Sequence, residues 1–155
     1  MRKLRNISKE FTFDCAHMLS GHEGLCSNLH GHTYKLIVTV EAPLEETEDI
    51  TPGNFMIVDY KILKQLVQEY IIDVFDHAMI FSEEYLRGPV EESIFNMIKN
   101  NCKYVEVPDR STAESMSEYM ACTLFNAFTE YGLGIDRLKI QLYETPTSCA
   151  EFILG

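Results

Sequence analysis

Apolar and polar side chains alternate in two segments of the first third of the chain, a pattern typical of half-buried β-strands. The first segment covers residues 11–17 and ends on His17. The second covers residues 34–40 and directly follows a motif that contains His30 and His32. The sequence therefore predicts two strands, one with a histidine at its end and the other with a histidine pair at its start.

The paired histidines are expected to lie on one face of the sheet. Side chains two residues apart in a strand point to the same side, so the rings of His30 and His32 share a face. Gly31 between them fits a close approach of another backbone at the strand start. Residues 18–29 join the two strands and would bring their ends, with His17, next to this pair. Three imidazoles gathered in this way predict a metal site.

The fourth ligand position decides what kind of metal site this is. Three imidazoles with an open fourth position make a catalytic zinc site, whereas a fourth protein ligand, often a thiolate, closes a structural one. Cys26 precedes the histidine pair, and Cys15 shares the strand face of His17, so both thiols are candidate ligands. His22 lies in a glycine-rich loop and is expected to be a solvated loop residue or a lid contact.

Helical spacing appears in two later segments. Apolar residues recur every three or four positions over residues 62–74, after Asp59 as a helix cap. A second helix is expected to open with a Ser-x-x-Glu capping box at residues 111–114 and to end at Gly132.

Three further short strands complete the expected order of elements. They are predicted at residues 55–58, at residues 138–144 and, as a short edge strand, at residues 152–154. Strands that flank two helices in this order predict an α+β domain with an antiparallel sheet.

Composition limits the fold and the partners. The chain has 155 residues, of which 46% are hydrophobic, so we expect one domain over residues 1–155. A net charge of −11 argues against nucleic-acid binding, because phosphate contacts need clustered Lys and Arg. The acidic residues concentrate in residues 41–49 and in the pairs 83–84 and 91–92, where we expect solvated loops or helix faces.

Cysteine usage and the N-terminus favour a cytoplasmic protein. The five cysteines are irregularly spaced without a CxxC pair, which argues against a disulfide framework and for a reducing compartment. Residues 1–6 have the charges of a signal peptide but no apolar stretch follows, and no run approaches the length of a membrane span. We therefore expect no membrane partner.

Two polar groups outside the histidine motif are candidates for chemistry. Asp76 and His77 lie between an apolar helix and the apolar run at residues 78–81, where a charged pair is costly unless partnered. They are either a solvated helix end or a proton carrier with a carboxylate that sets its tautomer. Glu144 is either a sheet-edge charge or an acceptor of two parallel hydrogen bonds from a guanidine-like ring edge.

Six short motifs follow one another along nearly the whole chain. They are Phe11-Thr12-Phe13-Asp14-Cys15-Ala16-His17, Cys26-x-x-x-His30-Gly31-His32, Val58-Asp59-Tyr60, Asp76-His77, Ser111-Thr112-Ala113-Glu114 and Tyr143-Glu144-Thr145. In this order they resemble the motifs of the 6-pyruvoyltetrahydropterin synthase / 6-carboxytetrahydropterin synthase family. The resemblance implies a T-fold, in which a four-stranded antiparallel sheet with two helices on one face assembles into β-barrel trimers that pair as hexamers.

The resemblance also implies roles for the metal site and the proton chemistry. The residues that it assigns to zinc are His17, His30 and His32. By the same resemblance, Cys26 is the thiolate that abstracts a proton, and Asp76 and His77 are its proton-relay partners from a neighbouring subunit. Zinc would act on the hydroxyls of the substrate side chain as a Lewis acid.

Substrate recognition follows from the same resemblance. Glu144 is expected to anchor the amino-pyrimidine edge of a pterin, and Thr112 and Glu114 are further substrate-binding candidates. The expected substrate is 7,8-dihydroneopterin triphosphate.

The spacing of the second motif distinguishes two branches of the family. Three residues separate Cys26 from His30, as in bacterial 6-carboxytetrahydropterin synthases of the queuosine and deazapurine pathway, whereas animal pyruvoyl synthases more often insert two further residues. The expected products are 6-carboxytetrahydropterin, acetaldehyde and triphosphate. Two alternatives stay open: triphosphate elimination to 6-pyruvoyltetrahydropterin, and a non-catalytic binding protein in which a thiol closes a structural zinc site.

Two features depart from the family pattern. Met18 stands where many bacterial members carry a basic residue, which removes one expected phosphate contact. Residues 82–109 form a longer segment than compact members have, and the sequence does not indicate its purpose.

Overall fold

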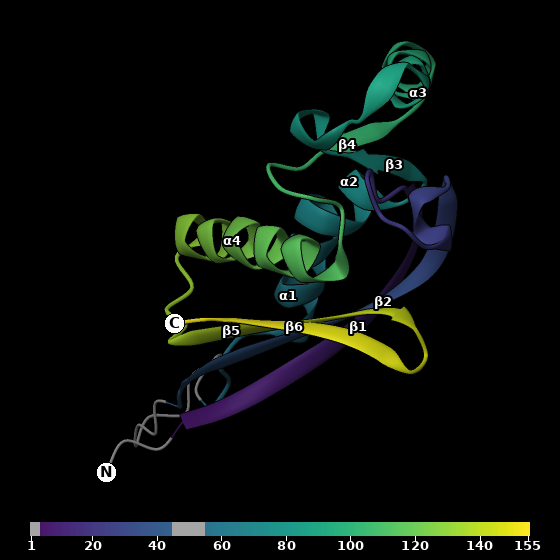
Figure 1. The fold of residues 1–155 in the computed structure, drawn as a ribbon. Helices are drawn as coiled ribbons and strands as arrows, with labels where there is room; N and C mark the ends of the chain where they lie inside the picture. The colour runs from purple at the N-terminus through teal and green to yellow at the C-terminus, as the bar shows by residue number, and fades with distance from the viewer. Residues whose placement is uncertain (1–3, 45–54) are drawn as a thin grey trace.

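One twisted sheet organises the molecule, with two helices across one of its faces (Figure 1). The computed structural model describes residues 4–44 and 55–155. The elements are β1 (Leu4–His17), η1 (Leu25–Ser27), β2 (His30–Pro43), α1 (Tyr60–Val67), η2 (Gln68–Ile72), α2 (Asp73–Phe75), β3 (Ala78–Phe81), η3 (Glu83–Tyr85), α3 (Gly88–Asn101), β4 (Tyr104–Glu106), α4 (Ala113–Tyr131), β5 (Arg137–Thr145) and β6 (Ser148–Leu154). Figure 1 shows α1 and α4 on the same side of the sheet, and α3 with β3 and β4 at one end.

The sheet has six strands in the order β4-β3-β1-β2-β5-β6. Strands β1, β2, β5 and β6 pair antiparallel, which confirms the predicted α+β class and its antiparallel sheet. Strand β3 pairs parallel with β1, and β4 pairs parallel with β3. The expectation of only four strands was therefore incomplete, because these two short strands extend the sheet beyond β1.

The register between β1 and β2 fixes the position of the site. His17 lies opposite His30, and Cys15 lies opposite His32. Because side chains in a strand alternate between faces, a slip of one residue would turn every side chain of one strand to the other face. The buried residues Phe13 and Tyr34, which are also opposite each other and stacked, oppose such a slip.

The core fills the space between the sheet and the two long helical segments. Its fully buried side chains alternate along β2 and β5 and recur along α1 and α4, as amphipathic elements require. The largest of them are Tyr34, Phe75, Phe128, Leu36, Leu63, Ile71, Ile80, Met116, Met120, Leu124, Leu138 and Ile140. This packing holds α4 across the same face of the sheet that carries the histidines.

The helices begin and end close to the predicted positions, with two differences. Asp59 caps α1 by accepting a hydrogen bond from the Lys61 N–H (2.8 Å), as predicted. The segment Gln68–Ile72 widens into a π-helix before α2, which the apolar spacing did not indicate. The capping-box prediction was wrong by one residue, because Thr112 and not Ser111 is the N-cap of α4.

The ends of the other elements also differ in part from expectation. Residues 55–58 form a turn and a bend, so the strand predicted there was wrong. The predicted edge strand at residues 152–154 is the end of the longer β6. As predicted, α4 ends at Gly132, which adopts the left-handed conformation (φ 88°). Most of the acidic segment at residues 41–49 lies outside the described residues.

Residues 82–109 form a packed extension with its own small core. The helix α3 covers β3 and β4 with apolar side chains that include Phe95 and Ile98, which meet Met79 and Phe81. The stretch that the sequence left unexplained therefore consists of η3, the helix α3 and the short strand β4, and it packs on β3 beside the end of β1.

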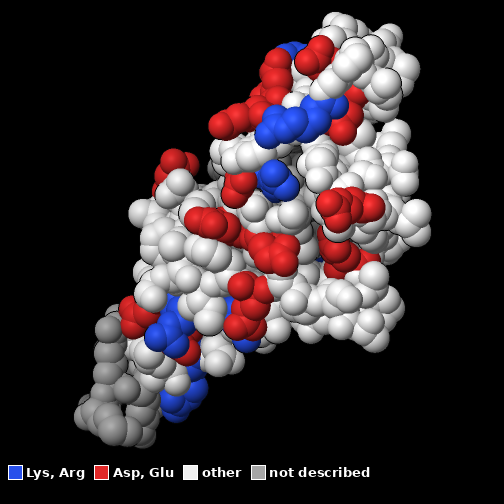
Figure 2. Space-filling view, viewed as in Figure 1, with Lys and Arg blue, Asp and Glu red and all other residues white. Residues whose placement is uncertain are grey.

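Acidic residues outnumber basic ones, 24 to 13. Figure 2 shows them spread over the visible face, whereas Lys and Arg form small groups near the α3 end and near the opposite end of the sheet. No broad basic surface appears on this face. Within the described ranges, no helix is both long enough and apolar enough to pass through a lipid bilayer.

Candidate functional site

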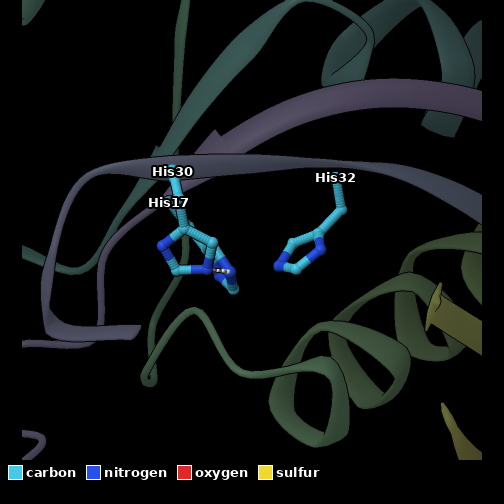
Figure 3. A group of neighbouring side chains, drawn as sticks. All are labelled: His17, His30 and His32. Carbon is cyan, nitrogen blue, oxygen red and sulfur yellow. Dashed lines mark hydrogen bonds between the residues drawn. The ribbon is translucent and has the colours of Figure 1, made fainter. Parts of the chain in front are cut away.

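Three imidazole rings meet where β1 ends and β2 begins. His17, His30 and His32 each offer a ring nitrogen, and these atoms lie within 4.8 Å of one another. Figure 3 shows the ring of His32 pointing toward the other two, on the side of the sheet where α4 lies. The structure thus brings His17 to the histidine pair of the second strand, as the sequence predicted.

Backbone carbonyls fix the orientation of two of these rings. The Nδ1 of His17 lies 2.6 Å from the carbonyl oxygen of Ser111, and the Nδ1 of His30 lies 2.7 Å from that of Asn28. A carbonyl oxygen only accepts, so each Nδ1 carries the proton and donates it. Each Nε2 therefore keeps its lone pair in the neutral ring, which is the form that binds a metal.

The two free nitrogens face each other at a distance that a metal explains. The Nε2 atoms of His17 and His30 are 3.1 Å apart. Two lone pairs at this separation repel unless a proton or a cation lies between them. In a tetrahedral zinc site with Zn–N bonds near 2.0–2.1 Å, ligand nitrogens are separated by roughly 3.3 Å. The donor set and its spacing therefore fit a zinc ion.

Burial favours the neutral form of the His17 ring. Only 1% of His17 is exposed, and this burial lowers its pKa despite the opposing effects of the Ser111 carbonyl and of Glu144. A neutral imidazole is available as a ligand, whereas an imidazolium is not. The closest carboxylate oxygen of Glu144 is 3.8 Å from the Nε2 of His17, so a negative charge lies beside the cluster.

Neither candidate thiol joins the three histidines among the residues that the structure describes. Cys26 is half-buried in the η1 turn, where its carbonyl accepts a hydrogen bond from the Leu19 N–H (2.8 Å). Cys15 lies opposite His32 and is buried, and this burial raises the pKa of its thiol, which disfavours the thiolate that a metal requires. Among the described residues, no thiol therefore closes the cluster as a fourth ligand.

Asp76 and His77 belong to a second group, separate from the histidine cluster. The carboxylate of Asp76 lies 3.0 Å from the Nδ1 of His77, as the proton-carrier hypothesis requires. Both side chains gather with Asp14, and the His77 side chain is 77% exposed. Within one chain, the His77 side chain therefore faces solvent. Among the described residues, Cys26 belongs neither to the histidine cluster nor to the group of Asp14, Asp76 and His77.

The backbone at His77 is held in an unusual conformation. His77 has a φ of 60°, in the left-handed region that costs a non-glycine residue about 1–2 kcal/mol. Its N–H donates to the carbonyl of Asp14 (2.6 Å), and the N–H of Asp14 donates to the Asp76 carboxylate (2.9 Å). These bonds connect the turn to β1 and offset the strain.

Glu144 lies on the cluster side of the sheet, at the end of β5. The hydroxyl of Tyr34 donates to its Oε1 (3.3 Å), and the Glu144 side chain is 28% exposed. Burial raises the pKa of Tyr34, so its hydroxyl stays protonated and serves as a donor. A partly exposed carboxylate oriented by a neutral donor fits a group that binds a ligand edge.

The other predicted substrate residues lie at the start of α4. Thr112 lines a hollow of about 420 Å³ together with His22 and Arg110. Glu114 is exposed in the first turn of α4. His22 is an exposed loop residue, as predicted, but it also borders this hollow.

Sequence reasoning missed three side chains around the site. Tyr34 had been counted only as an apolar strand residue, although its hydroxyl orients Glu144. Arg110 directly precedes the motif at the start of α4 and places a cation at the hollow. Lys103, in the unexplained extension, binds the turn that carries His77.

Comparison with known proteins agrees with this fold and these motifs. Residues 6–153 match the family model described as 6-pyruvoyl tetrahydropterin synthase. The chain is 40% identical over 147 residues to the 6-carboxy-5,6,7,8-tetrahydropterin synthase of Haemophilus influenzae, covering 94% of this chain and 96% of that protein. It is 30% identical over 149 residues to a putative 6-carboxy-5,6,7,8-tetrahydropterin synthase of Pyrococcus horikoshii, covering 90% and 83%.

Solved structures share the fold at low sequence identity. The 6-pyruvoyl tetrahydropterin synthase of Plasmodium vivax aligns with a TM-score of 0.70 at 17% identity, covering 99% of both chains. An uncharacterized protein of Wolinella succinogenes aligns with a TM-score of 0.71 at 22% identity, covering 97% of this chain and 98% of that one. The chain therefore has the T-fold and belongs to the 6-pyruvoyl tetrahydropterin synthase family, a family of enzymes.

The acidity of Asp76 gives a testable pH dependence. The backbone N–H of Asp14, and secondarily His77, hold the pKa of Asp76 below its ordinary value of 3.8. Because the folded-state pKa is lowered, the stabilisation is complete above the ordinary value and is lost as pH falls through the folded value. We expect Asp76→Asn to lower the free energy of unfolding in urea at about pH 7, with the difference from wild type shrinking below about pH 4. A difference that does not change with pH would contradict this assignment.

Proposed function

We propose that the protein is a zinc-dependent 6-carboxy-5,6,7,8-tetrahydropterin synthase. It takes 7,8-dihydroneopterin triphosphate and one water to 6-carboxytetrahydropterin, acetaldehyde and triphosphate, as a carbon–carbon and carbon–oxygen lyase of queuosine and 7-deazaguanine synthesis. The observation that carries this proposal is the cluster of three imidazoles, two of them oriented by backbone carbonyls, which no described thiol closes. The Haemophilus influenzae relative of the same name supports the choice of reaction.

The three histidines would hold the metal in this proposal. The carbonyls of Ser111 and Asn28 keep their rings turned so that the Nε2 atoms of His17 and His30 converge. When bound, zinc supplies a Lewis acid for the hydroxyls of the substrate side chain. The open position leaves room for those hydroxyls, whereas a thiol ligand would fill it.

Proton transfer would use groups from two chains. Cys26 lies in the turn that joins the histidine-bearing strands and abstracts a proton as the thiolate. His77 of a neighbouring subunit receives that proton, and Asp76 of that same subunit holds the ring and stabilises its charged form. The exposure of the His77 side chain, 77% in the single chain, supports a role in contact with another subunit. We therefore propose a homo-oligomer, a dimer of trimers, as the active form.

Glu144 would select the substrate ring. A carboxylate that accepts two parallel N–H bonds recognises the amino-pyrimidine edge of a pterin. Tyr34 holds the carboxylate in place, and Glu144 lies close enough to the cluster for one small substrate to reach both. Thr112, at the hollow beside the first turn of α4, and Glu114 are further substrate contacts in this proposal.

A pyruvoyl product is the second candidate. It is favoured by the description of the matching family model and by the names of solved relatives such as that of Plasmodium vivax. The three-residue spacing between Cys26 and His30 and the names of the curated relatives favour the carboxy product. A closed structural zinc site has less support, because neither Cys26 nor Cys15 joins the described cluster.

Product analysis tests the proposed reaction directly. The zinc-loaded protein should release acetaldehyde and triphosphate from 7,8-dihydroneopterin triphosphate and leave a product with the mass of 6-carboxytetrahydropterin. The variant Cys26→Ala should keep its zinc and form no product. A three-carbon pyruvoyl product without acetaldehyde would establish the second candidate, and loss of zinc from Cys26→Ala would indicate a structural thiol ligand.

Metal content tests the ligand assignment. We expect one zinc per chain, and we expect His30→Ala to lower zinc affinity sharply because one of three protein ligands is removed. The matched control His22→Ala removes an exposed loop imidazole outside the cluster, so its zinc content should equal that of wild type. Full zinc occupancy in His30→Ala, measured by mass spectrometry of the metal after dialysis, would overturn the assignment.

Subunit mixing tests the shared site. Cys26→Ala and His77→Ala should each be inactive, because each leaves every site without one proton-transfer group. After dissociation and reassembly together, some interfaces combine intact Cys26 from one chain with intact His77 from another. Activity should then return at a fraction set by random assortment. Mixed assemblies that are verified by mass and stay inactive would show that the two residues are not shared between chains.

A further inference from the structure

The extension at residues 82–109 places one cation directly on the turn that carries His77. The ammonium of Lys103 donates to the carbonyl of Asp73 (2.8 Å) and to the carbonyl of Asp76 (2.6 Å). Carbonyls at the end of a helix lack partners within the helix, and a cation there also interacts favourably with the helix dipole. Lys103 therefore caps the helical segment at the residue where it gives way to the Asp76–His77 turn.

The Asp76 carbonyl belongs to the peptide unit that joins Asp76 to His77, so a contact to it affects the backbone conformation of His77. The N–H of that same unit donates to the Asp14 carbonyl (2.6 Å). Both ends of one peptide plane are thus held, the oxygen by Lys103 and the nitrogen by Asp14. A peptide plane held at both ends fixes the dihedral angles on either side of it, including the positive φ of His77 (60°).

The backbone of Lys103 holds the other side of the same turn. Its carbonyl accepts a hydrogen bond from the N–H of Met79 (3.1 Å), two residues after His77. The same residue therefore binds the chain before and after His77, and both its backbone and its side chain take part. Lys103 and His77 also line one groove of about 570 Å³, which runs beside Asp14.

We propose that Lys103 is a positioning residue that sets the direction of the His77 side chain by fixing the Asp76–His77 peptide. The inference rests on the proposed function, in which His77 receives a proton in a neighbouring subunit's site. It also gives the extension a purpose, since α3 and β4 bring Lys103 to the turn. Lys103 acts through His77 and does not touch the reacting atoms.

Steady-state kinetics with three variants tests this role. Lys103→Met keeps much of the apolar stem and removes the donors, so kcat should fall roughly tenfold to hundredfold while KM stays near the wild-type value. Lys103→Arg retains a cation with N–H donors and should recover most of kcat. The matched control Lys99→Met removes a cation of α3 whose partners are Glu83 and the ring of Phe95, and it should not change kcat. An unchanged kcat in Lys103→Met would overturn the proposal.

Subunit mixing shows which half of the site is affected. If Lys103 acts through His77, assemblies of Lys103→Met with Cys26→Ala should gain activity, whereas assemblies of Lys103→Met with His77→Ala should gain none. The opposite pattern would mean that Lys103 supports the metal and thiol of its own chain, and would contradict the proposal. If Lys103→Met does not fold, Lys103→Gln, which keeps a single N–H donor group, replaces it in both experiments.

Amide hydrogen exchange provides a test that needs no substrate. The His77 N–H should exchange at least tenfold faster in zinc-loaded Lys103→Met than in wild type or Lys99→Met, because one of the two anchors of its peptide plane is lost. Amides at the centre of β2 should keep their wild-type rates. Faster His77 exchange in a protein that forms no pterin product would contradict the proposed function and leave the Lys103 contact established. Unchanged exchange would overturn the inference itself.

Discussion

The antiparallel register between β1 and β2 is the constraint on which the rest of the site depends. It places His17 opposite His30, with His32 one step along the same face. The stacked pair Phe13 and Tyr34 follows on that face and is buried under the helices, so hydrophobic burial and site assembly require the same register. The same packing holds the first turn of α4 above the strands, which brings the Ser111 carbonyl within 2.6 Å of the His17 ring.

The two faces of the sheet separate two kinds of chemistry. The face under α4 carries the histidine cluster, in which His17 is buried and has a lowered pKa for that reason, while His30 and His32 are half-buried. The turn after α2 carries an exposed imidazole beside Asp76, whose pKa is lowered by the N–H of Asp14. A metal site needs neutral, oriented rings, whereas a proton relay needs a ring that changes its charge. In the proposed assembly these two environments meet only between chains, so each chain keeps them apart.

Much of this site follows from local pattern. The strand period placed His30 and His32 on one face, because side-chain direction in a strand depends only on the parity of the position. The connection at residues 18–29 predicted that the end of the first strand, with His17, would lie beside them. The cap at Asp59 and the end of α4 at Gly132 are likewise encoded within a few residues. The sequence did not settle which residue caps α4, because Ser111 and Thr112 are both favourable N-caps. Tertiary contacts select Thr112, since Ser111 is buried and its carbonyl binds His17 of β1.

The remaining features depend on contacts between distant parts of the chain. The N–H of Asp14 donates to the carboxylate of Asp76, 62 residues further along the chain, and no local sequence pattern predicts that contact. Strands β3 and β4 are too short for a period to be recognised, with 4 and 3 residues. Lys103 looks like an ordinary surface lysine in the sequence, and only the parallel pairing of β3 with β4 brings it to the His77 turn.

X-ray absorption at the zinc edge of the purified protein tests the central claim most directly. Three imidazoles and an open position predict a first shell of nitrogen and oxygen near 2.0 Å, with the outer-shell signals of imidazole rings and no sulfur. A sulfur scatterer near 2.3 Å would contradict the account, because a thiol would then close the site and leave no position for the substrate.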